Sequence, residues 1–346
     1  MNNINLKRLA LRLNLSVSTV SKAFHDNYDI SPETKKRILK LAKQLNYQPN
    51  TFASNLRTQK SRTIAVVIPE ITNNFFALAI NGIESVAREK GYHVLIYLTH
   101  EDYANEVSFI QHLQSGRADG VIISLSDSAR SVTHLNNLRN KDIPIVFFDR
   151  IYEGMKATKV TTDDYESSYN ATRYLIELGC SKIAHFYYSK DLSIVNNRMK
   201  GYLQALKDYK LTFQKRYLVG CSSNNHENYQ LIKRHLTKAN RPEAIFSSFE
   251  NLAILCYQVC EELKLSIPGD VQIVSFSNLE TAALLNPSLT TITQPAYEIG
   301  QKAALALFQA LDKEGTGLSN EHIVIKSELI KRNSTTRLEN PSFRKP

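Results

Sequence analysis

The sequence predicts an α/β protein in which an all-α module at residues 1–62 precedes a body of alternating strands and helices. The hydrophobic pattern changes near residue 63, from apolar residues spaced three and four apart to short runs rich in β-branched residues. The charge changes there too, because residues 1–62 hold 12 Lys and Arg against 3 Asp and Glu, whereas the remainder is close to neutral. The composition, 42% hydrophobic and 22% charged over 346 residues, is typical of a soluble folded protein.

Three short helices are expected in the first module, each with one apolar stripe. Ser16 and Ser31 stand where a hydroxyl can cap a helix N-terminus, and Pro32 suits the first helical position that follows. The residues expected on the buried stripes are Leu6, Leu9, Ala10 and Leu13 in the first helix, Val20, Ala23 and Phe24 in the second, and Ile38, Leu41, Ala42 and Leu45 in the third.

A basic module of three short helices has two interpretations. One is a helix-turn-helix DNA-binding domain, whose second helix enters the major groove with outward residues small enough to approach base edges. Lys22 on that helix could then donate to guanine O6 and N7. The other is a small helical bundle with solvated lysines, and the pattern alone favours neither. The outward residues of the second helix are Val17, Ser18, Ser21, Lys22 and His25.

Three runs of sequence identify the module more closely. They are LSVSTVSKAF at residues 15–24, ISPETK at 30–35 and LNYQPN at 45–50. Together they resemble the headpiece of the lactose/galactose repressor (LacI/GalR) family. The resemblance implies a DNA-binding domain and makes double-stranded DNA the expected partner.

The resemblance also implies a role for individual residues. Bases are contacted in the family at the positions of Val17, Ser18 and Lys22. The family commonly has arginine at the position of Lys22, so the guanine contact is expected to be less bidentate here. The positions that hold phosphates or support those that do are Ser16, Thr19, Ser21 and Asn50.

Residues 50–58 resemble the hinge helix of the same family. So short a helix is marginal in water and is expected to order when it pairs with its symmetry mate on DNA. Ala53 and Leu56 are expected to contact DNA, and Leu56 matches the residue that opens a central base step through the minor groove. By residue type alone, Leu56 would be read as an ordinary core leucine.

The body from residue 63 onward is expected to form parallel sheets with helices on both faces. Ligands in such sheets bind beyond the carboxyl ends of the strands. The expected strands are 63–69, 92–99, 120–124, 143–148, 182–188, 244–249 and 271–277, and the helices between them include 75–90, 165–178, 198–209, 251–263 and 298–311.

The body also resembles the effector-binding core of the LacI/GalR family, a fold shared with periplasmic sugar-binding proteins. The resemblance implies two Rossmann-like subdomains joined by three crossovers, with a small molecule bound in the cleft between them. The motifs that match are Ile68-Pro69 with Asn73 to Phe76, Asp119 to Ile122, Pro144 to Arg150, Arg198 with Gly201-Tyr202, and Pro287 to Ile292 with Gln294-Pro295.

The expected organisation has four parts. A helix-turn-helix headpiece (1–47) leads into a hinge helix and linker (48–62), and the effector-binding core (63–336) is followed by a tail (337–346). Within the core, the N-subdomain is expected at 63–162 and 292–323, and the C-subdomain at 163–291 and 324–336.

Two adjacent phenylalanines, Phe75 and Phe76, fall where the family lines the N-subdomain side of the cleft. Aromatic faces there can stack on a sugar ring or a base. Core packing is the alternative role, and it is expected for one of the pair.

Two charged residues are expected in the cleft. Asp149, at a strand end, could accept hydrogen bonds from ligand hydroxyls, although pairing with Arg150 is a rival use. Arg198 occupies the position of the family's effector-contacting arginine, whose fixed donors suit hydroxyls or a carboxylate. Asp163 and Asp164 match a segment where the family usually has Asp-Asn, and either could instead cap the helix that follows.

The chain departs from the family pattern at two strand ends. The family usually has Asn-Asp where this chain has Phe249-Glu250, and Asp-Asp where it has Ser277-Asn278. Phe249 and Ser277 are still expected to line the effector site. Because the usual acceptors for sugar hydroxyls are partly lost, an altered carbohydrate, a phosphorylated sugar or another metabolite becomes more plausible than a conventional monosaccharide.

Other classes of protein find little support. The sequence has no dinucleotide, nucleotide, hydrolase or zinc-protease motif, so we expect no enzyme and no cofactor. The four cysteines show no CxxC pair, so neither a metal site nor a disulfide framework is indicated. No apolar run approaches the roughly 18 residues of a membrane span.

The sequence therefore predicts a cytoplasmic, sequence-specific transcription regulator that recognises a pseudopalindromic operator as a homodimer and senses a small-molecule effector, with repression as the expected mode. A solute-binding protein of the same core fold, acting in transport, is the alternative. That alternative predicts a secretory signal and no headpiece, whereas this sequence begins with the helix-turn-helix pattern. The tail has no apolar heptads, so a tetramerising coiled coil is not expected.

Overall fold

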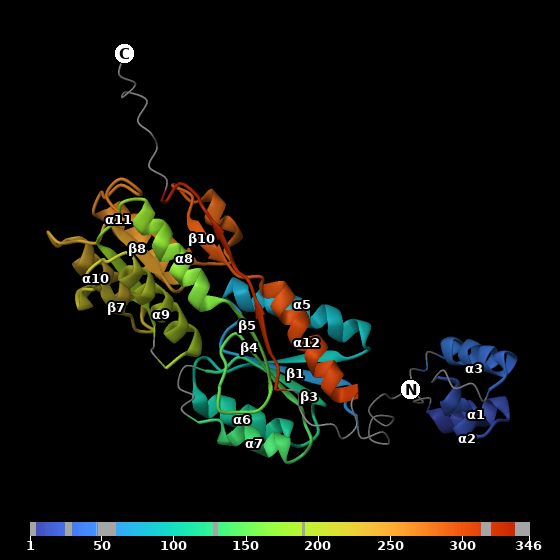
Figure 1. The fold of residues 1–346 in the computed structure, drawn as a ribbon. Coiled ribbons are helices and arrows are strands. Elements are labelled where there is room, and N and C mark those ends of the chain that lie inside the picture. Colours follow the sequence, from blue (N-terminus) through green and yellow to red (C-terminus); the bar gives the residue numbers. More distant parts are fainter. Residues whose placement is uncertain are drawn as a thin grey trace. The chain divides into compact units, whose positions relative to one another are not determined.

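A computed structural model describes residues 5–24, 30–45, 47, 60–126, 131–188, 191–312 and 320–335 (Figure 1). The chain forms two compact units, residues 1–61 and 62–346. Several positions with a predicted role lie outside the described residues, namely His25, Asn50, Ala53, Leu56 and the tail at 337–346.

The first unit contains α1 (Leu6–Leu13), α2 (Val17–Ala23) and α3 (Pro32–Gln44). Asn14 ends α1 in the left-handed conformation, with φ of 53°, and so turns the chain sharply into α2. As predicted, Ser16 and Ser31 cap α2 and α3, where their hydroxyls accept from the backbone N–H groups of Thr19 and Thr34. The predicted apolar stripes meet in one small core whose buried members are Leu9, Ala10, Val20, Ala23, Ile38 and Ala42.

The second unit contains two six-stranded sheets. The strands of the first follow the order β11-β5-β4-β3-β1-β2, and all its neighbours are parallel. The connections from β1 lead to β2 on one side and then back to β3 on the other, which creates a topological switch point beside β1. The strands are β1 (Thr63–Ile68), β2 (His93–Leu98), β3 (Gly120–Ile123), β4 (Ile145–Phe148), β5 (Thr158–Thr162) and β11 (His322–Ile325).

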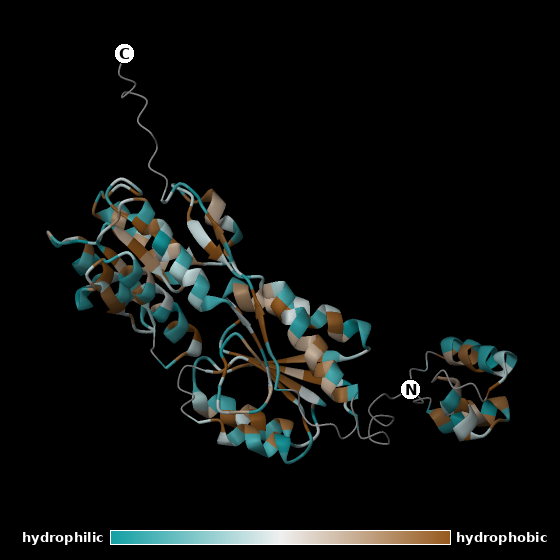
Figure 2. Ribbon diagram, in the orientation of Figure 1, coloured by the Kyte–Doolittle hydropathy of each residue, from teal (hydrophilic) through white to brown (hydrophobic). Residues whose placement is uncertain are grey.

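Helices cover both faces of this sheet (Figure 1). Ile64, Val66 and Ile68 of β1 pack toward one face, and the intervening Ala65 and Val67 pack toward the other. β1 is buried on both faces and is apolar from Ile64 to Ile68, in agreement with the largely brown colour of the central strands in Figure 2. The covering helices are α5 (Asn74–Glu89) and α12 (Ala296–Asp312) on the first face, and α6 (Tyr103–Leu113) and α7 (Thr133–Arg139) on the second.

The second sheet repeats this plan in the order β12-β10-β9-β8-β6-β7, with β12 antiparallel to β10. Its strands are β6 (Ile183–Tyr187), β7 (Leu218–Gly220), β8 (Ala244–Ser247), β9 (Gln272–Phe276), β10 (Thr290–Thr293) and β12 (Glu328–Ile330). One face is covered by α8 (Asp164–Glu177) and α9 (Ser193–Asp208), and the other by α10 (Asn225–Leu236) and α11 (Glu250–Glu262). The 3-10 turns are η1 (Lys215–Tyr217) and η2 (Glu280–Leu284).

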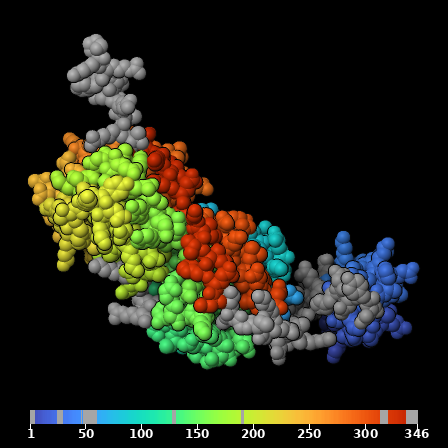
Figure 3. Space-filling view, in the orientation of Figure 1, coloured from blue at the N-terminus to red at the C-terminus, as the bar shows by residue number. Residues whose placement is uncertain are grey.

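The chain crosses between the sheets three times, after β5, after β10 and after β11. The last crossing segment, within residues 320–335, runs over the surface along both halves (Figure 3). Two crossing points differ by two residues from the expected limits, because β10 continues to Thr293 in the second sheet and β11 continues to Ile325 in the first. The ladder hydrogen bonds of each strand keep it in one sheet to its end.

All seven strands expected from the sequence are present, with ends within two residues of the expected positions. The strands that were not expected from the sequence are short or rich in threonine, such as β5 and β7. They therefore lack the run of apolar residues that is typical of a buried strand. Helix α9 begins at Ser193, five residues before the expected start, because Ile194 and Val195 are buried. No helix in the described parts of the chain has both the length and the apolar character needed to cross a membrane.

The close contact between α5 and α12 depends on Gly300. A Cβ atom at this position would overlap the carbonyl oxygen of Ala79 on α5. Alanine favours an exposed helix interior by about 1 kcal/mol over glycine, but forcing an atom into packed backbone costs about 1–3 kcal/mol. We therefore expect Gly300→Ala to lower the free energy of unfolding, measured by denaturant titration.

The exposed residue Lys302 on the same helix provides the control. Lys302→Ala should change the stability by no more than about 0.5 kcal/mol. A Gly300→Ala variant as stable as the native chain would show that the two helices accommodate the methyl group at a cost no larger than the gain in helix propensity.

Candidate functional site

The second unit contains a cleft of about 380 Å³ between the carboxyl ends of its two sheets. Its position is the one at which parallel sheets bind ligands. The residues that line the cleft are Asn73, Phe75, Phe76, Asp149, Arg150, Ile194, Arg198, Ser248, Phe249, Glu250, Phe276, Ser277, Asn278 and Gln294.

Arg198 organises the second-sheet side of the cleft. Its Nε donates to Oδ1 of Asp164 over 2.6 Å, and its Nη1 donates to the carbonyl oxygen of Ser248 over 2.5 Å. The guanidinium lies 3.7 Å from the ring centre of Phe276. Because only 2% of Arg198 is exposed, these partners replace the water that a buried cation loses. The side chain thus joins α9 to α8 and to the ends of β8 and β9.

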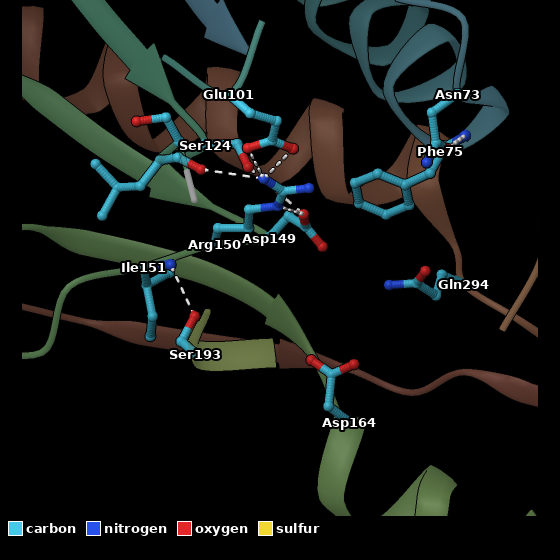
Figure 4. A network of polar contacts seen from close by, with 12 residues as sticks. Asn73, Phe75, Glu101, Ser124, Asp149, Arg150, Ile151, Asp164, Ser193 and Gln294 are labelled. Carbon is cyan, nitrogen blue, oxygen red and sulfur yellow. Dashed lines mark hydrogen bonds and ion pairs between the residues drawn. The ribbon is translucent and has the colours of Figure 1, made fainter. Parts of the chain in front are cut away.

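Arg150 occupies the opposite, first-sheet side (Figure 4). Its Nη1 donates to both carboxylate oxygens of Glu101 at 2.7 Å, whereas the carboxylate of Asp149 is 3.9 Å from its Nε. Glu101 is therefore the main partner of Arg150. The Asp149 carboxylate is only a weak partner of that guanidinium and keeps its acceptor capacity. The Asp149 carboxylate lines the cleft and faces its open centre.

Asp149 combines an unfavourable backbone conformation with a buried carboxylate. Its backbone is left-handed, with φ of 58°, a conformation that costs a non-glycine residue free energy and is concentrated at functional sites. Its side chain is buried, and burial raises the pKa to about 6 against the opposing positive charges of Arg150 and Arg198. The hydroxyl of Ser124 donates to it over a long 3.5 Å. Asp149 is thus an incompletely solvated acceptor at the centre of the cleft.

Glu250 supplies a carboxylate near a strand end where the sequence pattern had lost one. Its Oε2 accepts from the hydroxyl of Ser277 over 2.9 Å and from the backbone N–H of Asn278 over 3.2 Å. The Asn278 amide nitrogen in turn donates to the carbonyl oxygen of Gln294. The substitution of the usual acidic pair by Ser277-Asn278 is therefore offset by an acid from the neighbouring strand end.

The two phenylalanines of the first-sheet wall differ in their surroundings. Phe76 packs edge-on against Phe148 of β4, with ring centres 6.1 Å apart, and has a core role. Phe75 projects toward the centre of the cleft from the start of α5 (Figure 4). Both line the cavity, and the expected division between a core and a cleft residue agrees with this arrangement.

A buried histidine lies beneath the wall of the cleft that the second sheet forms. His185 of β6 stacks on Tyr202, and one ring nitrogen, Nε2, is 3.1 Å from the hydroxyl of Ser248. Burial, together with the positive charge of Arg198, lowers the pKa of His185 to about 3. The ring is therefore neutral at physiological pH and adds no positive charge to the cleft.

Hydrogen bonds also connect the two sides of the cleft. The backbone N–H of Ile151, directly after Arg150, donates to the Ser193 hydroxyl at the start of α9 over 3.1 Å. On another crossing segment, the Gln294 amide nitrogen donates to the hydroxyl of Thr162 over 3.3 Å. A change in the separation of the two walls must alter these bonds.

All six residues predicted for the effector site line this one cleft, namely Phe75, Phe76, Asp149, Arg198, Phe249 and Ser277. Asp163 holds the N-cap position of α8, but its carboxylate accepts from the hydroxyl of Ser167 and the N–H of Ser327, and Asp164 pairs with Arg198. Neither acid therefore caps the helix with a backbone bond of its own. The lining residues that the prediction did not include are Asn73, Arg150, Ile194, Ser248, Glu250, Phe276, Asn278 and Gln294.

Part of this omission was avoidable. Glu250 and Asn278 directly follow the expected strands 244–249 and 271–277, so the rule that ligands bind at carboxyl ends would have selected them. No local pattern indicates Ile194, which reaches the cleft only through the way α9 packs.

The first unit presents a separate candidate surface on α2. Ser16, Val17 and Ser18 are exposed at its N-terminal end, and Thr19, Ser21 and Lys22 are half-buried. The Ser16 hydroxyl is 2.8 Å from that of Thr19 and holds the first turn. Exposed N-terminal residues on the second helix of such a pair are those that reach base edges in helix-turn-helix proteins.

A helix-turn-helix unit joined to a two-sheet ligand-binding core defines a class of protein, the DNA-binding transcription regulators. The family described as bacterial regulatory proteins, lacI family, matches residues 5–50, and the family of periplasmic binding proteins and sugar binding domain of LacI family matches residues 61–333. The chain belongs to the LacI family. It is accordingly a DNA-binding regulator rather than a transport protein or an enzyme.

Individual relatives match over most of the chain. Catabolite control protein A of Priestia megaterium is 26% identical over 90% of this chain and 94% of its own length. The HTH-type transcriptional repressor CytR of Escherichia coli K12 is 28% identical over 96% of each protein. These matches include both the headpiece and the core.

Solved structures share the fold. A LacI family regulator from Enterococcus faecium with bound ribose is 28% identical, with a TM-score of 0.70 over 80% of this chain and 100% of that one. The lac repressor dimer bound to operator and the anti-inducer ONPF has a TM-score of 0.84 over 97% of this chain and 100% of its own. At 19% identity the second likeness establishes the fold alone.

The raised pKa of Asp149 predicts how the free energy of unfolding changes with pH. Because burial raises its pKa from 3.8 to about 6, the native state binds this proton more tightly, and ionisation of Asp149 costs the folded protein up to about 3 kcal/mol above pH 6. Asp149→Asn removes that cost. The variant should therefore gain stability relative to the native chain as the pH rises from about 4 to about 7, measured by denaturant unfolding across that range.

Glu262→Gln is the matched control, because its carboxylate has the opposite shift. Hydrogen bonds from Lys233 and Tyr229 lower the pKa of this exposed acid, so its removal should cost a little stability as the pH rises. If Asp149→Asn gained no stability at neutral pH, the assignment of a desolvated carboxylate would be wrong.

Proposed function

We propose that this protein is a cytoplasmic repressor that binds a pseudopalindromic operator as a homodimer, and that a sugar or sugar derivative in the cleft controls its affinity for that operator. The observation on which this rests is the meeting of all six predicted effector residues in one cleft of a chain that also has a LacI-type headpiece. The relatives named as repressors, such as CytR, support the direction of control.

The headpiece, the hinge and the core each have a proposed role in this function. The headpiece at 1–47 recognises DNA, the hinge at 48–62 connects it to the core at 63–336, and the tail at 337–346 has no assigned role. In α2, Val17, Ser18 and Lys22 contact bases. Phosphates are bound or supported by Ser16, Thr19, Ser21 and Asn50, and the minor groove is contacted by Ala53 and Leu56.

The effector acts through the geometry of the cleft. Arg198 and Asp149 line the cleft from its two walls, and Phe75 offers an aromatic face to a ring. A ligand held by both walls changes their separation, and that change biases pairing of the hinge segments on DNA. The coupling is reciprocal, so a ligand that weakens operator binding must itself bind the DNA complex more weakly.

The decisive experiment is selection of bound duplexes from a random DNA pool, sequenced with and without a metabolite extract. Enrichment of a palindrome supports a dimeric DNA-binding protein, because two recognition helices occupy two half-sites. A change on adding the extract identifies the direction of control. No enriched sequence under either condition would contradict the proposed function.

Lys22 provides a test of base recognition. Lys22→Ala should reduce affinity for the selected operator by a factor corresponding to about 1–3 kcal/mol and relax the base preference at one position of each half-site. Lys43→Ala, an exposed lysine on α3, removes the same charge and should weaken binding to all sequences alike. Equal effects of the two substitutions on base preference would refute the assignment of Lys22.

Leu56 provides a test of the hinge, although it lies outside the described residues. Leu56→Ala should impair operator binding far more than non-specific binding, because a wedge between base steps serves only a bent, specific complex. Affinities for operator and random duplexes at one salt concentration measure the difference. Equal losses on both would contradict the wedge.

A further inference from the structure

The cleft has an excess of negative charge. The two cations in its lining are Arg150 and Arg198. Four carboxylates lie in the lining or in contact with these cations, namely Glu101, Asp149, Asp164 and Glu250. With all of them ionised, this group has two more negative than positive charges, and the neutral His185 beneath the second wall does not offset them.

Both guanidinium groups already have strong anionic partners. Arg198 is paired with Asp164 at 2.6 Å, and Arg150 with Glu101 at 2.7 Å. An anionic ligand would have to compete with a built-in carboxylate for either cation, and would meet the remaining carboxylates as well. The geometry therefore disfavours the phosphorylated sugar that the sequence departures made plausible.

The surplus carboxylates lie on opposite walls. Asp149 on the first-sheet wall has only a 3.9 Å approach to Arg150 and a 3.5 Å bond from Ser124. Glu250 on the second-sheet wall accepts from Ser277 and from the N–H of Asn278, and forms no ion pair with the lysines and arginines that the structure describes. Two acceptors are thus available to a ligand rich in donors.

The apolar lining suits the same ligand. Rings of Phe75, Phe76, Phe249 and Phe276 border the cleft. Guanidinium groups already lie over Phe76, Phe249 and Phe276, so Phe75 is the ring that offers its face to the cation of a ligand. Two buried polar atoms of the lining, Asn278 Oδ1 and Arg150 Nε, have no hydrogen-bond partner among the described residues. Such atoms are costly unless a ligand or water satisfies them, and one acceptor and one N–H donor fit neighbouring hydroxyls.

We propose that the cleft binds a ligand with a protonated amine on a hydroxyl-bearing skeleton, of which an amino sugar is the simplest kind. Asp149 and Glu250 receive the amine and its neighbouring hydroxyls, and the aromatic rings enclose the skeleton. This inference rests on the proposed function, since it specifies the effector of the same cleft. Of the ligand classes that the sequence left open, it favours one with an ammonium group over a phosphorylated sugar.

The test compares matched probes on the full-length protein. The probes are glucose, galactose and mannose, the corresponding 2-amino sugars, and the corresponding 6-phosphates. Thermal unfolding should shift upward with at least one amino sugar, by more than with its parent or its phosphate, because a ligand that binds the native state stabilises it. A larger shift with a phosphate or a neutral parent, or no shift with any amino sugar, would overturn the proposal.

Substitutions then locate the recognition. For the amino sugar that binds best, Asp149→Asn and Glu250→Gln should each raise the calorimetric Kd by about tenfold or more, because each removes a charged acceptor. The Kd of the neutral parent should change far less. Glu262→Gln, which removes a carboxylate outside the cleft, should leave both values unchanged. Equal weakening for amine and parent would show that the carboxylates do not recognise charge.

Operator binding separates this proposal from the proposed function. If a phosphorylated or neutral sugar binds and alters affinity for the selected operator, the regulator is effector-controlled and only the ammonium assignment is wrong. If an amino sugar binds the cleft but leaves operator affinity unchanged, the ligand class stands and the regulatory role of the cleft fails.

Discussion

The ion pair between Arg198 and Asp164 is the contact on which the second wall of the cleft depends. Two charges that are each about 3% exposed are stable in the interior only because they satisfy one another at 2.6 Å and find further partners. The carbonyl of Ser248 and the ring of Phe276 supply those partners. One side chain therefore sets the relative positions of two helices and two strand ends. Removing either charge would leave the other buried and uncompensated.

The first wall is built on a different principle. Arg150 is neutralised by Glu101, which leaves the neighbouring Asp149 buried, in a left-handed backbone conformation and with a raised pKa. Such a residue is unfavourable for the free protein and becomes favourable when a ligand completes its contacts. The hydrogen bond from Ile151 to Ser193 joins this wall to α9, which carries Arg198. A ligand that shifts Asp149 therefore also shifts Arg198.

The headpiece has a much smaller reserve of stability. Among the residues that the structure describes, its core has six buried apolar side chains, and domains of this size are marginally stable. Most of the chain's excess positive charge belongs to the same module. A polyanion that binds the folded headpiece stabilises it by mass action, so folding and DNA binding support each other. The large core, with two sheets covered on both faces, has no such need.

The sequence by itself determined those features that depend on neighbouring residues. The helices of the headpiece followed from apolar spacing and from the caps Ser16 and Ser31, and the buried strands followed from runs such as 63–68. Strand ends and the family resemblance together selected six residues of the cleft. These signals are local, because helix caps and strand periodicity act over a few residues.

Only the tertiary structure decided how the charges combine. The partners of Arg198, Arg150 and Glu250 lie 34, 49 and 27 residues away along the chain, and no local pattern distinguishes a paired guanidinium from an open one. The sequence therefore showed a lost acidic pair at Ser277-Asn278 and left an altered carbohydrate, a phosphorylated sugar or another metabolite as the expected ligand. The fold brings Glu250 to that position and a carboxylate to each arginine, because strands far apart in sequence end side by side at one cleft, where the sum of their charges determines what can bind.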